Sequence, residues 1–144
     1  MFTKRITVFR LLGFEVKIDL SWLLLALLVA WTLAVGVFPT LYPSLAPGVY
    51  WGMGVLGVVI LLFSIVLHEL SHSLVARHYG FPIKGITLFI FGGVAEMDEE
   101  PPTARAEFFM AVAGPLSSGV IALILYGLFR WSVAWRWPIP LQGV

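Results

Sequence analysis

A five-residue motif, His68-Glu69-Leu70-Ser71-His72, carries the clearest chemistry in the sequence. On a helix, positions i and i+4 differ by about 40° around the axis and roughly 6 Å along it, so both imidazoles lean toward one point. Two neutral imidazole nitrogens in that arrangement can bind one Zn²⁺ ion, and Glu69 lies where it can take a proton from a metal-activated water molecule. The motif therefore predicts two zinc ligands, His68 and His72, with Glu69 as general base.

The alternative is that these histidines are ordinary hydrogen-bonding groups near a helix end. It must be considered because the motif defines only three positions and can occur by chance. The surrounding sequence argues against it. No charged residue occurs from Leu20 to Leu67, so the motif lies at the end of a long apolar stretch. Ionisable groups inside a membrane helix cost about 2.5–3.5 kcal/mol each on insertion scales and usually mark function. Two of the chain's three histidines lie there, which favours the metal site.

The composition is that of a membrane protein. Of the 144 residues, 60% are hydrophobic and 12% are charged, whereas about a quarter of the residues are charged in soluble domains. The formal net charge of +1 comes from few and scattered basic residues, which argues against a nucleic-acid partner. The chain has no cysteine, so disulfides, thiolate zinc sites and cysteine nucleophiles are excluded.

Three apolar segments predict membrane-spanning helices. We expect Ser21 to cap a first helix over residues 22–38, which prolines at positions 39, 43 and 47 should end. The second helix should run from about residue 48 through the motif to Arg77. The third should cover residues 108–129, where small residues spaced four apart allow close packing against another helix.

The charge distribution predicts the orientation of these helices. Four basic residues precede the first span and none lies in the loop at 39–48, so the positive-inside rule places the amino terminus in the cytoplasm. His68 and His72 would then lie toward the cytoplasmic side of the membrane, which we expect to be a prokaryotic cell membrane.

Two further segments predict a small sheet at the membrane. Residues 4–19 show a β-rich pattern on both sides of Leu12-Gly13, which indicates a hairpin, with a disordered basic leader as the alternative. Residues 86–91 are too short to span and favour a strand, which must pair with the hairpin or with a bound chain. We expect an edge of this strand to bind an extended substrate, with an ordinary buried strand as the alternative. The acidic run from Glu96 to Glu107 is typical of a solvated loop.

The predicted fold class is therefore an α-helical polytopic membrane protein. It has about three transmembrane helices and a small membrane-associated β-sheet, made of the amino-terminal hairpin and the strand near 86–91. We expect residues 1–144 to form a single membrane-embedded unit. A catalytic zinc normally has three protein ligands, and the motif provides two. The aspartates Asp19 and Asp98 fall in predicted surface segments, and His78 lies on another face of its helix.

The motif with its flanks (residues 67–77), the segment 86–95 and the segment 107–115 together resemble the site-2 proteases, the intramembrane zinc metalloproteases. The resemblance extends over nearly the whole chain and includes Ser21-Trp22. It implies a membrane-embedded metalloprotease core that cleaves transmembrane protein substrates within or near their spans in the lipid bilayer. The substrate, the trigger for cleavage and the oligomeric state, including a homo-oligomer, stay open.

Carried over residue by residue, the resemblance implies that His68 and His72 bind Zn²⁺ and that Glu69 is the general base. In the family the third ligand is an aspartate in an Asp-Gly motif on a later helix, often beside Asn-Pro. Nothing here matches, since the chain has no asparagine, so we expect the amino-terminal part of a longer protease. Asp19 departs from the family, whose members often carry histidine there. The alternative function is a catalytically incomplete membrane module that binds zinc weakly or regulates a full-length partner.

Overall fold

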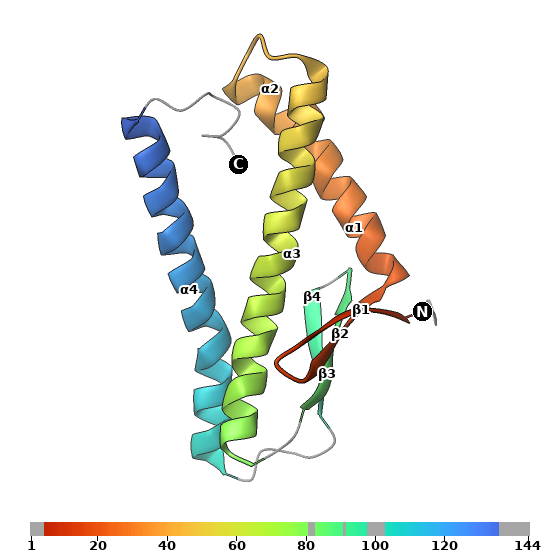
Figure 1. Cartoon of the computed structure of the whole chain (residues 1–144), viewed down its shortest axis with the longest axis vertical. Helices are drawn as coiled ribbons and strands as arrows, with labels where there is room; N and C mark the ends of the chain where they lie inside the picture. The colour runs from red at the N-terminus through yellow and green to blue at the C-terminus, as the bar shows by residue number, and fades with distance from the viewer. Residues whose placement is uncertain (1–4, 81–82, 91, 98–102, 136–144) are drawn as a thin grey trace.

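The computed structural model describes residues 5–80, 83–90, 92–97 and 103–135. Four strands and three long helical rods make up this part of the chain (Figure 1). In chain order the elements are β1 (Arg5–Leu11), β2 (Phe14–Asp19), α1 (Leu20–Trp31), the π-helical segment η1 (Thr32–Val37), α2 (Phe38–Leu41), α3 (Pro47–His78), β3 (Ile83–Phe89), β4 (Gly92–Met97) and α4 (Ala104–Ala134).

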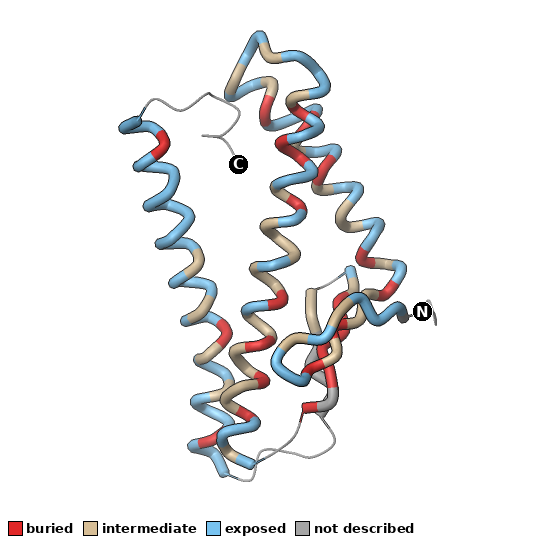
Figure 2. Tube along the Cα trace, viewed as in Figure 1, coloured by how far each residue is buried: buried red, intermediate tan, exposed pale blue. Residues whose placement is uncertain are grey.

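Three helices are long and apolar enough to cross a membrane, namely Leu20–Leu41, Pro47–His78 and Ala104–Ala134. Their outer surfaces expose many large apolar side chains, and α4 is almost entirely exposed (Figure 2). So much exposed apolar surface would be unfavourable in water and suits a lipid environment. The predicted fold class, three helices of spanning length with a small sheet, is confirmed, and each helix extends one to five residues beyond its predicted ends.

The start and end of the first helix differ from the prediction. Asp19, not Ser21, is the N-cap, because its carboxylate accepts a hydrogen bond of 2.9 Å from the Ser21 backbone N–H. Pro39 does not end the helix. It lies in the first turn of α2, directly after the π-helical segment, and this local π-helical adjustment accommodates the ring and the carbonyl that the missing N–H leaves without a helical donor. The helical rod therefore continues to Leu41.

The four strands form one sheet in the order β1-β2-β3-β4, with β2 and β3 parallel and the outer pairs antiparallel. The predicted hairpin is confirmed, and its turn residues Leu12 and Gly13 have φ angles of 50° and 91°, typical of two-residue hairpin turns. The predicted strand at 86–91 is β3, shifted to Ile83–Phe89, and it pairs with the hairpin as expected.

The expectation that this strand offers a free edge is wrong. β3 lies in the middle of the sheet, with β2 on one side and β4 on the other, and Leu88 is fully buried. The outer strand is β4, which the sequence did not predict because it opens with two glycines, residues disfavoured in strands. Gly92, with φ of 123°, begins it directly after the turn. Within the described residues, the sheet therefore ends at β4 on this side.

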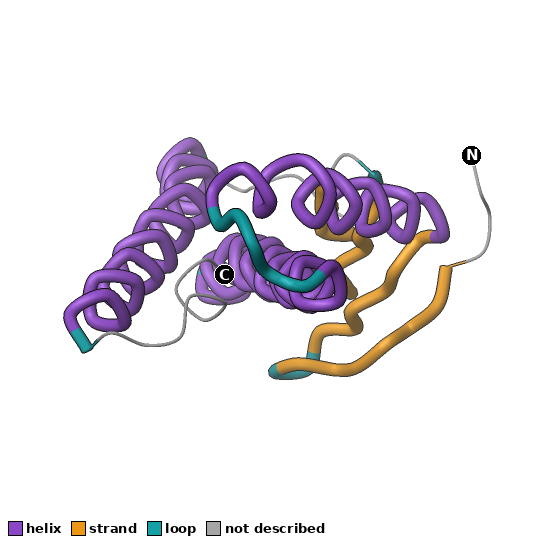
Figure 3. The backbone as a smooth tube through the Cα atoms, turned by 90° about the horizontal axis from the view of Figure 1, so that it is seen from above, coloured by secondary structure: helices purple, strands orange, loops and turns teal. Residues whose placement is uncertain are grey.

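The sheet packs against α3, and α3 lies between the sheet and α4 (Figure 3). The apolar core at this junction includes Val16, Ile86 and Val66, which are 0%, 0% and 1% exposed. Arg77, near the end of α3, donates a hydrogen bond of 2.9 Å to the Leu12 carbonyl oxygen in the hairpin turn. These contacts fix the sheet beside the carboxyl-terminal third of α3, where the His68–His72 motif lies.

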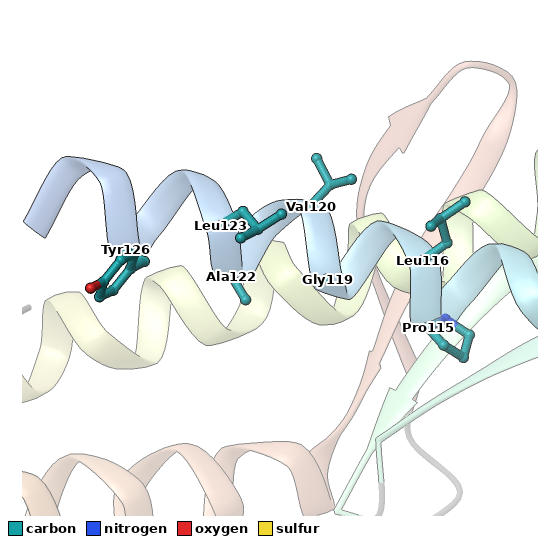
Figure 4. A pocket seen from close by; sticks show the side chains of 7 residues that line it. All are labelled: Pro115, Leu116, Gly119, Val120, Ala122, Leu123 and Tyr126. Atoms are coloured by element: carbon teal, nitrogen blue, oxygen red, sulfur yellow. The ribbon is translucent and has the colours of Figure 1, made fainter.

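A shallow apolar hollow lies along the surface of α4 (Figure 4). All of its lining side chains come from that one helix: Pro115, Leu116, Gly119, Val120, Ala122, Leu123 and Tyr126. None is a histidine or a carboxylate. The hollow therefore contains no candidate metal ligand or general base.

Candidate metal centre

The two motif histidines face each other on α3. His68 Nε2 and His72 Nε2 are 3.1 Å apart, and the ring centroids are separated by 4.8 Å in an edge-on arrangement. Both side chains are half-buried. This is the convergence that the i, i+4 spacing predicts, and it leaves the two Nε2 lone pairs as the candidate metal ligands.

The opposite nitrogen of each ring is held by α4. His72 Nδ1 is 2.5 Å from the Met110 carbonyl oxygen, and His68 Nδ1 is 2.8 Å from Ser118 Oγ. A metal-binding histidine typically donates its second ring N–H to a carbonyl, carboxylate or similar acceptor, which orients the ring and leaves the other nitrogen free to bind. Both histidines have such a partner.

A glycine lets α4 approach the two Nε2 atoms closely. A Cβ placed on Gly114 of α4 would lie 2.6 Å from His68 Nε2 and even closer to His72 Nε2. A tetrahedral zinc with Zn–N distances of about 2.0–2.1 Å places two imidazole nitrogens about 3.3–3.4 Å apart, close to the 3.1 Å between these two. The donor atoms, their separation and their outer hydrogen bonds therefore fit a zinc ion.

Glu69 points away from α4 and toward the sheet. A Cβ on Gly93, in strand β4, would lie 2.9 Å from Glu69 Oε1, so the carboxylate rests directly against the strand backbone. The side chain is half-buried. The general base predicted from the motif therefore lies on one side of the histidine pair, beside the outer strand of the sheet.

The remaining candidate ligands do not join the pair. Asp19 is buried and caps α1, and His78 is exposed at the end of α3, where its ring contacts Tyr79. Asp98 lies outside the described residues. Among residues 5–80, 83–90, 92–97 and 103–135, no group of three His, Cys, Asp or Glu side chains could hold a metal ion.

Four contributors to the site were not predicted from the residues: Met110, Gly114 and Ser118 on α4, and Gly93 on β4. Sequence reasoning explained the small residues of α4 by helix packing, and that packing is present, because Gly114 is buried against α3. The sequence did not indicate that the atoms packed against Gly114 are those of the His68 and His72 imidazoles. The only available signal was the set of short segments, 86–95 and 107–115, that carry the family resemblance.

Comparison with known proteins identifies the family of the chain. The sequence profile of peptidase family M50 matches residues 56–134, more than half of the chain. The chain is 38% identical over 92% of its length to a Synechocystis protein provisionally named zinc metalloprotease sll0528. It is 35% identical over 83% of its length to zinc metalloprotease MJ0392 of Methanocaldococcus jannaschii. It covers 33% and 31% of these two proteins, and thus spans about a third of their length.

A solved structure gives the same result. The site-2 protease from Methanocaldococcus jannaschii superposes with a TM-score of 0.60 at 30% sequence identity, covering 89% of this chain and 52% of that one. The profile match runs through the histidine motif and most of α4, the two elements that build the candidate metal centre. The chain therefore belongs to peptidase family M50, the family of site-2 proteases and membrane zinc metalloproteases.

Proposed function

We propose that the protein is an intramembrane zinc endopeptidase that hydrolyses peptide bonds within or near the transmembrane segments of other membrane proteins. One observation carries the proposal. Two imidazole Nε2 atoms converge 3.1 Å apart within a long apolar helix, and the carboxylate of Glu69, the residue between them in the motif, rests against a strand. Family membership supports a membrane metalloprotease, and the substrate class is our extension.

His68 and His72 would hold the zinc ion. When bound, zinc would supply a Lewis acid that activates water and stabilises negative charge on the carbonyl oxygen of the scissile bond. Glu69 takes a proton from the attacking water as the new C–O bond forms, and returns it to the amide nitrogen as the C–N bond breaks. The third ligand that such a site needs is, by the resemblance, an aspartate of an Asp-Gly motif.

The orientation follows the charges of the hairpin. Arg10 and Lys17 lie in the hairpin, at the end of the molecule that carries the sheet and the metal centre, and the loop between α2 and α3 has no charged residue. By the positive-inside rule the sheet lies on the cytoplasmic side. The peptide bond is then cleaved in the part of the membrane nearer the cytoplasm.

Zinc removal tests this function. The protein is reconstituted in lipid vesicles with a synthetic single-span peptide that carries a fluorophore and a quencher at its two ends. We expect cleavage to fall to background when a chelator removes zinc, and to return when zinc is added back. A zinc-independent protease in the same vesicles controls for damage by the chelator. Cleavage that continues after zinc removal would exclude a zinc endopeptidase.

The outer strand β4 is the element best placed to bind the substrate. Its backbone at Gly93 touches the Glu69 side chain, and among the described strands it ends the sheet. An extended peptide can add to such an edge through main-chain hydrogen bonds. Binding there also unwinds the substrate helix, whose amides are otherwise shielded by their own hydrogen bonds. We propose that β4, and not β3, aligns the scissile bond beside the general base.

Backbone methylation of the substrate tests strand addition. In an added strand, alternate N–H groups point toward the protein. N-methylation of two amides of one set removes two hydrogen bonds, each worth about 0.5–1.5 kcal/mol net, and should raise KM roughly 5- to 150-fold. The control peptide carries the two methyl groups one residue further along. Equal effects of the two patterns would argue against binding as a strand.

One observation favours the alternative, a membrane module that binds zinc without catalysis. Among the described residues only two metal ligands converge, whereas a catalytic zinc normally has three protein ligands. Such a module would bind zinc weakly and would show no cleavage in the vesicle assay, with or without added zinc. The same assay therefore separates the two functions.

A further inference from the structure

The two histidines of the metal centre are held by partners of different chemistry. His72 Nδ1 faces the backbone carbonyl of Met110, and His68 Nδ1 faces the hydroxyl of Ser118. A carbonyl oxygen can only accept a hydrogen bond, so His72 must carry its proton on Nδ1. A hydroxyl rotates freely and can either donate or accept. The structure therefore fixes the tautomer of His72 and leaves that of His68 free to change.

The contact between the two rings determines which nitrogen of His68 carries the proton. His72 with its proton on Nδ1 has only a lone pair on Nε2, and this atom lies 3.1 Å from His68 Nε2. Before a metal binds, a hydrogen bond at this position requires the proton on His68 Nε2, and Ser118 then donates to His68 Nδ1. When both Nε2 atoms bind a metal, the His68 proton must be on Nδ1, and Ser118 then accepts.

We propose that Ser118 is a positioning residue for zinc binding, and that its rotatable hydroxyl keeps the His68 ring in one orientation in both tautomers. The proposal rests on the zinc site of the proposed function. Without the hydroxyl, His68 Nδ1 loses its partner when it carries the proton, which is the tautomer that metal binding needs. The neighbouring Ser117 differs, because its hydroxyl donates to the Gly114 carbonyl within α4 at 2.8 Å.

Zinc affinity of four variants tests the role of the hydroxyl. Ser118→Thr keeps it, whereas Ser118→Val has nearly the same shape and lacks it, and Ser118→Ala removes it with less bulk. We expect Thr to bind zinc within about threefold of the parent, and Val and Ala to bind at least about 10-fold more weakly, the lower end for outer partners of metal-binding histidines. Ser117→Ala should match the parent. Equal affinity of the Thr and Val variants would overturn the proposal.

Nitrogen NMR of the imidazoles gives a second readout that a general loosening of the fold would not produce. At alkaline pH in detergent micelles, the parent and Ser118→Thr should show the His68 proton on Nε2 without metal and on Nδ1 with zinc. The His72 proton should stay on Nδ1 throughout. In Ser118→Val only the His68 signals should change. A His68 proton already on Nδ1 without metal, or His72 signals that change equally, would overturn the proposal.

Neither measurement depends on proteolysis. A protein that binds zinc and shows the tautomer change but cleaves no substrate would contradict the proposed function and leave the role of Ser118 intact. A protein that cleaves substrate in a zinc-dependent way but binds zinc equally well with valine at position 118 would support the proposed function and contradict the role of Ser118.

Discussion

Replacing Glu69 by glutamine is expected to lower peptide hydrolysis by about 10²- to 10⁴-fold, the usual contribution of a positioned general acid–base group, while zinc stays bound. Glutamine has nearly the shape of glutamate, so the contact with Gly93 is retained. It cannot take a proton, so the attacking water keeps its own. The measurement is the rate of peptide cleavage in vesicles, together with the zinc content of the same sample.

Glu107→Gln is the matched control for this substitution. Glu107 is an exposed carboxylate in the first turn of α4, so the change removes one negative charge without touching the histidine pair. Its cleavage rate should stay close to that of the parent protein. Retention of full activity by Glu69→Gln would show that another group transfers the proton. Loss of zinc from that variant would show that Glu69 binds the metal.

Replacing Gly114 by alanine is expected to weaken zinc binding by more than about 100-fold, since changes to the outer partners of metal-binding histidines already cost about 10- to 100-fold. The added methyl group would lie within 3 Å of both His68 Nε2 and His72 Nε2, closer than non-bonded atoms can approach. Either the rings turn away or α4 moves back and withdraws its hydrogen bonds from both Nδ1 atoms. Both responses separate the two ligand atoms from their metal-binding positions.

Gly119→Ala separates this effect from a general change in the helix. The same methyl group on Gly119, five residues further along α4, meets nothing within 4 Å. Alanine stabilises a helix interior by about 0.5–1 kcal/mol relative to glycine, so both variants should keep their helical content by circular dichroism. Competition with a zinc indicator gives the affinities. Similar affinities for the two variants would contradict the view that a side chain at position 114 displaces the two imidazoles.

The sequence was most informative where one physical effect dominates. Long apolar stretches specify spanning helices regardless of their neighbours, so the α3 prediction of about 48–77 agrees closely with the observed Pro47–His78. The spacing of His68 and His72 specifies their convergence, because four residues on a helix make slightly more than one turn. The turn at Leu12-Gly13 specifies the hairpin. In each case the information is local.

The features of the fold and site that the sequence did not predict depend on contacts between segments that are distant in the sequence. Nothing local to Ser118 or Gly114 indicates that α4 packs against the histidine face of α3, since any apolar face of a membrane helix can meet another. Strand β4 is specified by pairing with β3, as in Thr87 with Val94, more than by its own residues. The N-cap role of Asp19 was not predicted, because its charge indicated a surface strand. In the structure Asp19 both ends β2 and caps α1.

The parallel pairing of β2 with β3 has a consequence for how the chain folds during synthesis. Val16 pairs with Ile86, and two helices of membrane-spanning length lie between them in the sequence. A two-stranded hairpin is only marginally stable alone, and contacts between distant residues form slowly. The hairpin therefore cannot pair with β3 until both of these helices have been synthesised. The sheet is completed late in synthesis, so Glu69 meets its neighbour in β4 only after the helix that carries it has been made.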